Sequence, residues 1–294
     1  MSEASEMSDD MSDDTGDDMS NGMGDMRARD DWMPLPLAPE VRQRLNGVPL
    51  VVMLDVDGTL APIVSRPDEA EVPRGTQHAV AALAVRPHVH VALVSGRSAG
   101  DARRMVAVSE VWVIGNHGSE TVSPDGEETV DPRVAPFEGA MARALRELSR
   151  LLAHVPGVLV ENKRWTLSVH YRLADERVVP QVEAAVQRVA HDLGLRVHDG
   201  KMVYEVRPPA RVDKGTAVLA LAQRLGGLAD GAALLFAGDD RTDEDAFRAL
   251  RLRAPHAVTI RVTDDVTTPT AAEYRLANPA AVRTLLEELA ATSA

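Results

Sequence analysis

The sequence LDVDGTLAPI, at residues 54–63, joins a run of apolar residues to a sharp change in chain direction. Together with the apolar residues before it, PLVVMLD at residues 49–55 is typical of a buried strand that ends at Asp55. Gly58 and Thr59 then allow the chain to turn away. Asp55 and Asp57 are therefore predicted at the carboxyl end of a strand, where open α/β sheets place their ligands.

These two carboxylates indicate a metal ion. In locally extended chain, residues two apart project to the same side, so both side chains can reach one centre. Neighbouring carboxylates repel each other unless a cation lies between them. The chain contains no cysteine, which excludes thiolate ligands and disulfides, and a site made of oxygen ligands favours Mg²⁺.

Short apolar runs alternate with helical patterns on both sides of this strand, as in a parallel α/β sheet. The alternation of strand and helix is interrupted at residues 122–206. There the pattern predicts a helix, two strands, a second helix and two further strands, which together form a compact α+β unit. We therefore predict an α/β protein with a Rossmann-like parallel-sheet core and an inserted α+β cap. The core is expected at residues 39–121 and 207–294, and the cap at 122–206.

Other polar residues fall at the ends of predicted strands or at the starts of helices. In VSGRS, Ser95 and Gly96 open a helix, where a hydroxyl and free backbone N–H groups suit a phosphate oxygen. In AGDDRTDEDAF, helix capping accounts for some of the acids, but not for two consecutive Asp after a buried strand. Lys214 precedes an apolar helix, where it either reaches an anion above the sheet or lies on the surface.

DxDGT, a serine at a strand end, a lysine at a helix start and GDDxxD occur in this order on successive elements. The order resembles the four motifs of the haloacid-dehalogenase superfamily. The resemblance implies that Asp55 is a nucleophile and Asp57 a general acid and base. It also implies that Ser95 and Lys214 hold the phosphoryl group. The implied Mg²⁺ ligands are Asp55, Asp57, Asp239 and Asp243.

Several segments resemble trehalose-6-phosphate phosphatases in particular, over about residues 48–290. They are LDVDGTLAPI, VSGR, GNHGSE, ENKRWTLSVHYR, GKMVYEVRP and GDDRTDEDAF. The resemblance implies hydrolysis of trehalose 6-phosphate through an aspartyl-phosphate, with a cap that closes over the core and grips the sugar. His170 is interpreted as structural, and Asn116 occupies a position that varies in the family. The implied substrate-binding residues are Gly96, Arg97, His117, Gly118, Glu161, Lys163, Glu205 and Arg207. For His117 a bond to a neighbouring backbone group stays an alternative to substrate contact, and for Arg207 the alternative is to pair with Glu205 and position it.

Two alternatives stay open. A phosphatase of another sugar phosphate, such as sucrose phosphate or mannosyl-phosphoglycerate, would carry the same catalytic groups, because only the cap separates these activities. A non-catalytic regulatory domain of a trehalose synthesis complex would be expected to have lost Asp55 or Asp57, and both are present.

Most of the net charge of −13 lies at the N-terminus, where residues 1–31 carry eleven acidic residues and two Arg. We expect residues 1–38 to be a disordered acidic tail and linker. The rest of the chain has no basic stripe for nucleic acid, and no apolar run approaches the ~20 residues that span a bilayer. These features predict a cytoplasmic protein that binds a small molecule and neither nucleic acid nor membrane. The resemblance implies that this small molecule is a sugar phosphate, and we expect the protein to be a monomer.

Overall fold

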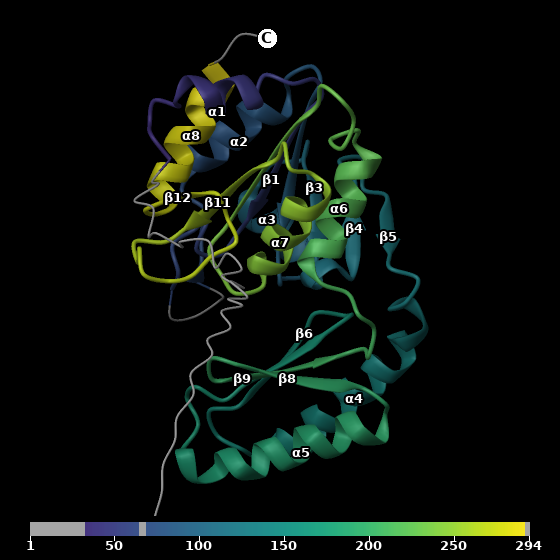
Figure 1. Cartoon of the computed structure of the whole chain (residues 1–294). Coiled ribbons are helices and arrows are strands. Elements are labelled where there is room, and N and C mark those ends of the chain that lie inside the picture. The colour runs from purple at the N-terminus through teal and green to yellow at the C-terminus, as the bar shows by residue number, and fades with distance from the viewer. Residues whose placement is uncertain (1–32, 65–68, 292–294) are drawn as a thin grey trace, which may run out of the picture. The chain divides into compact units, whose positions relative to one another are not determined.

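The computed structural model describes residues 33–64 and 69–291 (Figure 1). Most of the acidic tail expected at residues 1–38 lies outside these residues. Met33 and Leu37 are described, and both are buried in the main core with Val41 of helix α1 (Pro39–Arg44). The Met33 N–H donates to the carbonyl of Arg275 at 2.8 Å. The packed core therefore includes residues that precede position 39.

The larger sheet has eight strands in the order β12-β11-β10-β1-β2-β3-β4-β5. Neighbouring strands from β12 to β3 are parallel, whereas β4 and β5 add an antiparallel edge. The predicted α/β class is confirmed, with a sheet that is mixed and mostly parallel. The strands are β1 (Leu50–Asp55), β2 (Val89–Val94), β3 (Trp112–Gly115), β4 (Glu120–Val122), β5 (Glu128–Val130), β10 (Ala233–Gly238), β11 (Val258–Val262) and β12 (Tyr274–Leu276).

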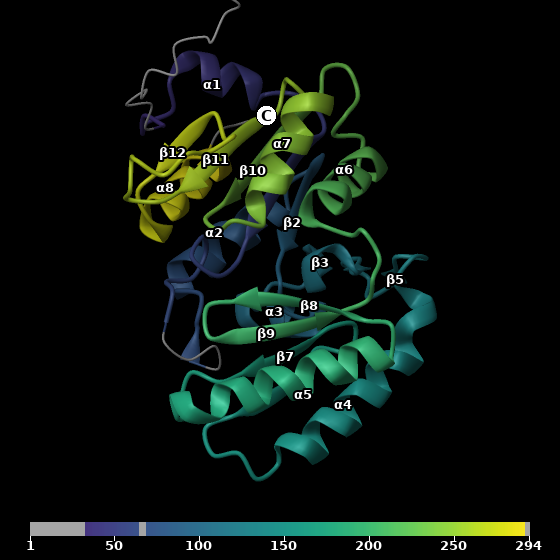
Figure 2. The ribbon, with the colours of Figure 1, turned by 60° about the horizontal axis from the view of Figure 1, so that its bottom comes forward.

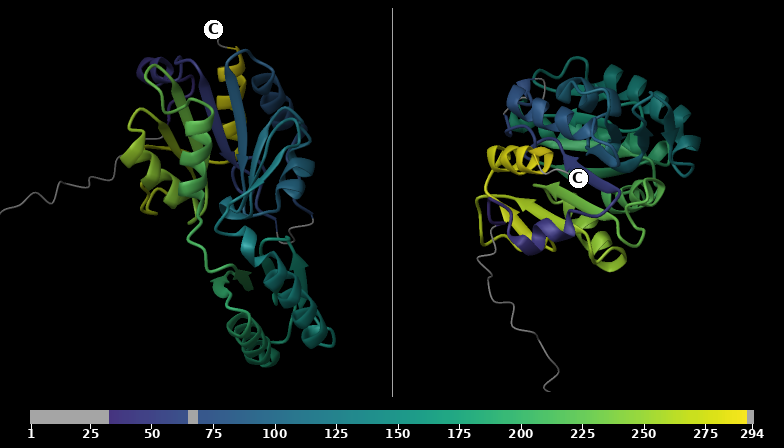
Figure 3. Two further views of the ribbon diagram at one scale, coloured as in Figure 1. Left: turned by 90° about the vertical axis from the view of Figure 1, so that its right-hand side faces the viewer. Right: turned by 90° about the horizontal axis from the view of Figure 1, so that it is seen from above.

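Helices cover both faces of this sheet (Figure 3). Because successive side chains of a strand point to opposite faces, Val52 and Leu54 of β1 pack in one apolar cluster and Val51 and Met53 in the other. The first cluster includes α2 (Arg74–Ala84), α3 (Ala99–Val106) and α8 (Pro279–Ala291), and the second includes α6 (Lys214–Arg224) and α7 (Asp243–Arg253). Within the described residues, we find no helix with the length and apolar character needed to cross a membrane.

The segment of the chain between β5 and α6 contains a second, antiparallel sheet (Figure 2). Its strands are arranged in the order β6-β7-β9-β8. Its strands are β6 (Leu159–Asn162), β7 (Leu167–His170), β8 (Arg196–Gly200) and β9 (Val203–Arg207). Helices α4 (Glu138–Leu152) and α5 (Val179–Asp192) pack on one face and bury Leu167 and Val206 in a core of their own. This is the expected α+β cap. Strand β5, within the expected cap range of residues 122–206, pairs with β4 in the larger sheet. The exact bounds of the cap stay predictions.

Polar side chains lie on the face of the cap sheet that α4 and α5 do not cover. Glu161 of β6 pairs with Ser168 of β7, which in turn pairs with Glu205 of β9. The alternate residues Val160, Val169 and Tyr204 pack in the cap core. The alternation therefore places two carboxylates on the side of the sheet that is not covered by α4 and α5.

Candidate active site

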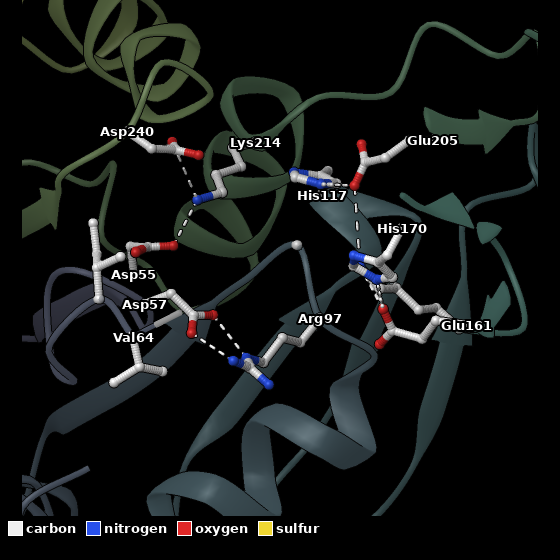
Figure 4. Close-up of a pocket in the computed structure, with 13 residues that line it drawn as sticks. Asp55, Asp57, Val64, Arg97, His117, Glu161, His170, Glu205, Lys214 and Asp240 are labelled. Carbon is white, nitrogen blue, oxygen red and sulfur yellow. Dashed lines mark hydrogen bonds and ion pairs between the residues drawn. The ribbon is translucent and has the colours of Figure 1, made fainter. Parts of the chain in front are cut away.

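Three neighbouring strands of the larger sheet bring distant motifs together. Strands β10, β1 and β2 run parallel and side by side, so their carboxyl ends lie at one edge. Asp55 ends β1, Ser95 follows β2, and Asp239 follows β10. Helix α6 begins with Lys214, which lies beside Asp55 (Figure 4). Helix α7 begins with Asp243, which also bonds Lys214. The sheet geometry thus assembles residues that are far apart in sequence.

Lys214 lies at the centre of this group and is only 2% exposed. Its Nζ donates to Asp55 Oδ1 at 2.6 Å and to Asp243 Oδ1 at 2.8 Å. Burial acts to lower the pKa of Lys214, but the nearby carboxylates outweigh it and hold that pKa well above its usual value. The side chain is therefore a fixed positive charge beside Asp55, and the surface position that the sequence left open is excluded.

Asp55, Asp239 and Asp243 form a compact acidic cluster. One carboxylate oxygen from each lies within 4.8 Å of the other two. Burial, together with the neighbouring acids, raises the pKa of Asp55 and of Asp243 well above the usual range, although Lys214 opposes the rise. Burial, then Asp243 and Asp240, raises the pKa of Asp239 to about 7.

The chemistry of this cluster fits a metal ion. Asp239 Oδ1 is buried and has no hydrogen-bond partner among the described residues. Three crowded carboxylates with an unsatisfied oxygen are the kind of donor set that hard divalent cations prefer. The arrangement therefore constitutes a candidate metal site.

Asp57 lies apart from the acidic cluster, although it was expected to be a fourth ligand. Arg97 Nε donates to Asp57 Oδ2 at 2.7 Å, and Arg97 Nη2 donates to Asp57 Oδ1 at 2.6 Å (Figure 4). Both carboxylate oxygens are thus directed to Arg97. The structure does not bring the Asp57 carboxylate into the group formed by Asp55, Asp239 and Asp243.

The turn after β2 is close-packed. Ser95 is buried, and its hydroxyl accepts a hydrogen bond from the Arg97 N–H at 3.1 Å. A Cβ on Gly96 would lie 2.5 Å from His117 Cε1, so glycine is required for the imidazole to pack against this turn. Gly118 has φ +110° and packs against Ala217 at the start of α6. Gly118 thus shapes the loop and, unlike Gly96, does not line the cavity described next.

A cavity of about 250 Å³ extends from the acidic cluster to the polar face of the cap sheet. The core contributes both charged and apolar side chains, and the cap contributes charged and polar ones. The residues that line it are Asp55, Asp57, Ile63, Val64, Gly96, Arg97, His117, Glu161, Lys163, His170, Glu205, Lys214 and Asp240.

Glu205 is surrounded by basic groups. His117 Nε2 lies 3.7 Å and Lys163 Nζ 4.0 Å from Glu205 Oε1, and Arg207 donates to the other carboxylate oxygen. Burial acts to raise the pKa of Glu205, but His117, Arg207 and Lys163 outweigh it and hold the pKa well below its usual value. Burial lowers the pKa of His117 to about 4, so His117 is neutral near pH 7. Arg207 thus contacts Glu205 and does not line the cavity.

Glu161 has two partners in the cap. His170 Nε2 lies 2.9 Å from Glu161 Oε2 (Figure 4). Lys163 Nζ lies 3.8 Å from the same oxygen. These groups outweigh the effect of burial and hold the pKa of Glu161 below its usual value. Of the expected substrate-binding residues, all except Gly118 and Arg207 line this one cavity.

Four lining residues were not predicted as site residues: Ile63, Val64, His170 and Asp240. His170 was interpreted as structural, but it lines the cavity. The alternation along β7 places it on the same face of the cap sheet as Ser168, which is the cross-strand neighbour of Glu161 and Glu205. Its position on that face was the signal available in the sequence. Asp240 Oδ1 accepts hydrogen bonds from the N–H groups of Thr242 and Asp243, so it also caps the start of α7.

The raised pKa of Asp239 affects how the stability of the metal-free protein depends on pH. Because the folded state binds the Asp239 proton more tightly than an unfolded chain does, the metal-free protein should lose stability as the pH rises from about 4 to about 7. Asp239→Asn removes this loss, and we expect it to stabilise the metal-free protein by about 1–3 kcal/mol at pH 7.5. Thermal melts in chelator at pH 5 and 7.5 would measure the effect. A variant that melts no higher than wild type at pH 7.5 would contradict it.

The mostly parallel sheet, the inserted cap and the Asp/Lys cluster at the sheet edge define the fold of the haloacid-dehalogenase-like hydrolases. A haloacid dehalogenase-like hydrolase from Bacteroides thetaiotaomicron is 15% identical and superposes with a TM-score of 0.52, over 81% of this chain and 98% of that chain. At this identity the likeness concerns the fold alone. The chain belongs to the trehalose-phosphatase family, whose model matches residues 53–280.

Individual proteins are similar to most of this chain. The trehalose-phosphate phosphatase of Mycobacterium avium is 39% identical over 242 residues, which are 81% of this chain and 61% of that protein. An uncharacterized glycosyl hydrolase of Mycobacterium tuberculosis is 37% identical over 259 residues, which are 87% of this chain and 19% of that protein. This chain thus spans less than two thirds of the length of either relative. A crystal structure of a trehalose-6-phosphate phosphatase related protein is 26% identical with a TM-score of 0.69, over 81% of this chain and 95% of that chain.

Proposed function

We propose that this protein is a magnesium-dependent phosphatase that hydrolyses trehalose 6-phosphate to trehalose and phosphate, as a step of trehalose biosynthesis. One observation carries the proposal. Buried Asp55 is held by Lys214 at the acidic cluster, and it lines the same cavity as the cap residues Glu161, Lys163 and Glu205. A nucleophile and a polar sugar-binding surface thus share one space.

The core residues have the chemistry for phosphoryl transfer. Asp55 attacks phosphorus in line and forms an aspartyl-phosphate, which splits the hydrolysis into two easier steps. Lys214, already 2.6 Å from Asp55, neutralises the charge that develops on the phosphoryl oxygens. The Ser95 hydroxyl and the Gly96 N–H bind the same group. Mg²⁺ bound by Asp55, Asp239 and Asp243 would supply further neutralisation of this charge.

Asp57 serves both steps. It protonates the leaving sugar oxygen, and then it takes a proton from the attacking water. Both of its carboxylate oxygens are bonded to Arg97. Arg97 must therefore release at least one of them before Asp57 acts, and this frees the guanidinium to bind the substrate.

The cap residues are the basis for the choice of sugar. A disaccharide presents many hydroxyls, and charged groups on a sheet face can bond several of them at once. Glu161, Lys163 and Glu205 are arranged in this way, and the partners of the two carboxylates hold both in the ionised form. Family membership supports a sugar phosphate as the substrate class, and trehalose 6-phosphate is the specific proposal. A cytoplasmic location and a monomeric state stay predictions.

Lys163→Ala tests this division of labour between core and cap. We expect its efficiency toward trehalose 6-phosphate to fall roughly ten- to a hundredfold, which corresponds to the loss of about 1.5–3 kcal/mol from a hydrogen bond to a charged group. Hydrolysis of p-nitrophenyl phosphate, which has no sugar hydroxyls, should barely change.

Steady-state kinetics on both substrates would measure the effect, with Lys201→Ala as the matched control. Lys201 is exposed in the turn between β8 and β9 and lies outside the cavity. Equal losses on both substrates with Lys163→Ala would mean that Lys163 does not bind the sugar.

A further inference from the structure

Asn116 is buried where the core meets the turn between β6 and β7. Its Nδ2 donates to Glu120 Oε1 at 2.8 Å and to the carbonyl oxygen of Lys163 at 2.9 Å. Its Oδ1 accepts from the Thr166 hydroxyl at 2.7 Å. Both amide hydrogens are therefore used, and one side chain joins the core to two residues of the cap.

The backbone at Asn116 and His117 is hydrogen-bonded to the turn after β2, which carries Ser95 and Arg97. Its N–H donates to the carbonyl of Arg97 at 2.7 Å, and the N–H of His117 donates to the carbonyl of Ser95 at 3.0 Å. Asn116 has φ +50°, a left-handed conformation that asparagine tolerates better than most residues. The residue thus connects the turn that carries Ser95 and Arg97 to the cap turn that carries Lys163.

Glu120 makes this connection stiffer. The same Oε1 that bonds Asn116 also accepts from the N–H of Ala99, the first residue of α3, at 2.8 Å. Glu120 is buried, so this oxygen is shielded from water. The start of α3, the loop at Asn116 and the cap turn are therefore linked through adjacent hydrogen bonds.

The cap turn at residues 163–166 is held by its own backbone hydrogen bonds. The Lys163 N–H donates to the Thr166 carbonyl at 3.1 Å, and the Trp165 N–H donates to the Lys163 carbonyl at 2.9 Å. Residues 163–166 are thus tied together by backbone hydrogen bonds, and Asn116 bonds the first and the last of them. The Lys163 ammonium lies in the cavity, between Glu161 and Glu205.

We propose that Asn116, acting with Thr166, is a positioning residue that fixes the spacing between the phosphoryl-binding turn and Lys163. This spacing sets the selectivity for sugar phosphates over phosphates without a sugar. The inference rests on the proposed function of the site. A displacement of about 1 Å between a binding group and the reacting centre is enough to reduce turnover substantially.

Thr166 offers a matched pair of variants. Thr166→Val keeps the shape and removes the hydroxyl that bonds Asn116, whereas Thr166→Ser keeps the hydroxyl. We expect Thr166→Val to raise KM for trehalose 6-phosphate about tenfold and to leave kcat/KM for p-nitrophenyl phosphate within about twofold of wild type. Thr166→Ser should behave like wild type on both substrates. Asn116→Ala should show the same selectivity with a larger loss.

Thermal melts separate positioning from folding. A purely structural role predicts lower melting temperatures with equal changes on both substrates, and this result would overturn the proposal. Equal behaviour of Thr166→Val and Thr166→Ser would overturn it as well. A wild-type preference for another sugar phosphate would remove trehalose 6-phosphate as the substrate, and the comparison would then use the preferred sugar. If the wild type prefers no sugar phosphate, both the function and this inference fail.

Discussion

Asp55→Asn should lose phosphatase activity by at least about a thousandfold while it stays folded. Asparagine has nearly the same shape as aspartate, and its carbonyl oxygen can still accept the hydrogen bond from Lys214. Its amide cannot form an aspartyl-phosphate, so the first chemical step is blocked. Phosphate release at saturating substrate would measure the loss, and a thermal melt would establish that the variant is folded.

Asp245→Asn is the control for this experiment. Asp245 lies in the first turn of α7, close to the acidic cluster in sequence, but its side chain is exposed and pairs with Arg248. We expect it to retain nearly full activity. If folded Asp55→Asn keeps more than a few per cent of wild-type turnover, Asp55 is not the nucleophile.

Removal of divalent cations should abolish turnover, and added Mg²⁺ should restore it. The carboxylates of Asp55, Asp239 and Asp243 lie within 4.8 Å of one another, and they repel each other when a cation does not share them. The same change should be visible without substrate, because Mg²⁺ that binds the folded state raises the melting temperature. Asp243→Asn should weaken that rise. Full activity in excess chelator would remove the metal from the mechanism.

The strand-end motifs were predictable from the sequence because of one property of parallel sheets. Neighbouring parallel strands end at the same edge, so Asp55, Ser95 and Asp239 meet whatever their separation along the chain. The buried strands β1 and β10 are continuous apolar runs, which made these ends easy to locate. Lys214 could be placed only through the resemblance, because a single lysine before a helix carries no signal of burial.

Other features depend on side-chain directions that a linear pattern does not encode. The period of two along extended chain predicted that Asp57 would join Asp55, but the turn after β1 directs its carboxylate to Arg97 instead. Strands β4 and β5 have three residues each, too few for an alternating pattern to be distinctive. The bonds of Asn116 to the cap join residues that are about fifty positions apart, so only the folded chain reveals them.

The most direct test of the central claim is phosphate release by the wild-type protein from a panel of sugar phosphates, with and without Mg²⁺. The panel contains trehalose 6-phosphate, sucrose 6-phosphate, glucose 6-phosphate and p-nitrophenyl phosphate. We expect kcat/KM for trehalose 6-phosphate in Mg²⁺ to exceed that for each of the others by at least about tenfold, as the loss of one hydrogen bond to a charged group would predict. A clear preference for another sugar phosphate would contradict the trehalose assignment, and no release from any member of the panel in Mg²⁺ would contradict the phosphatase itself.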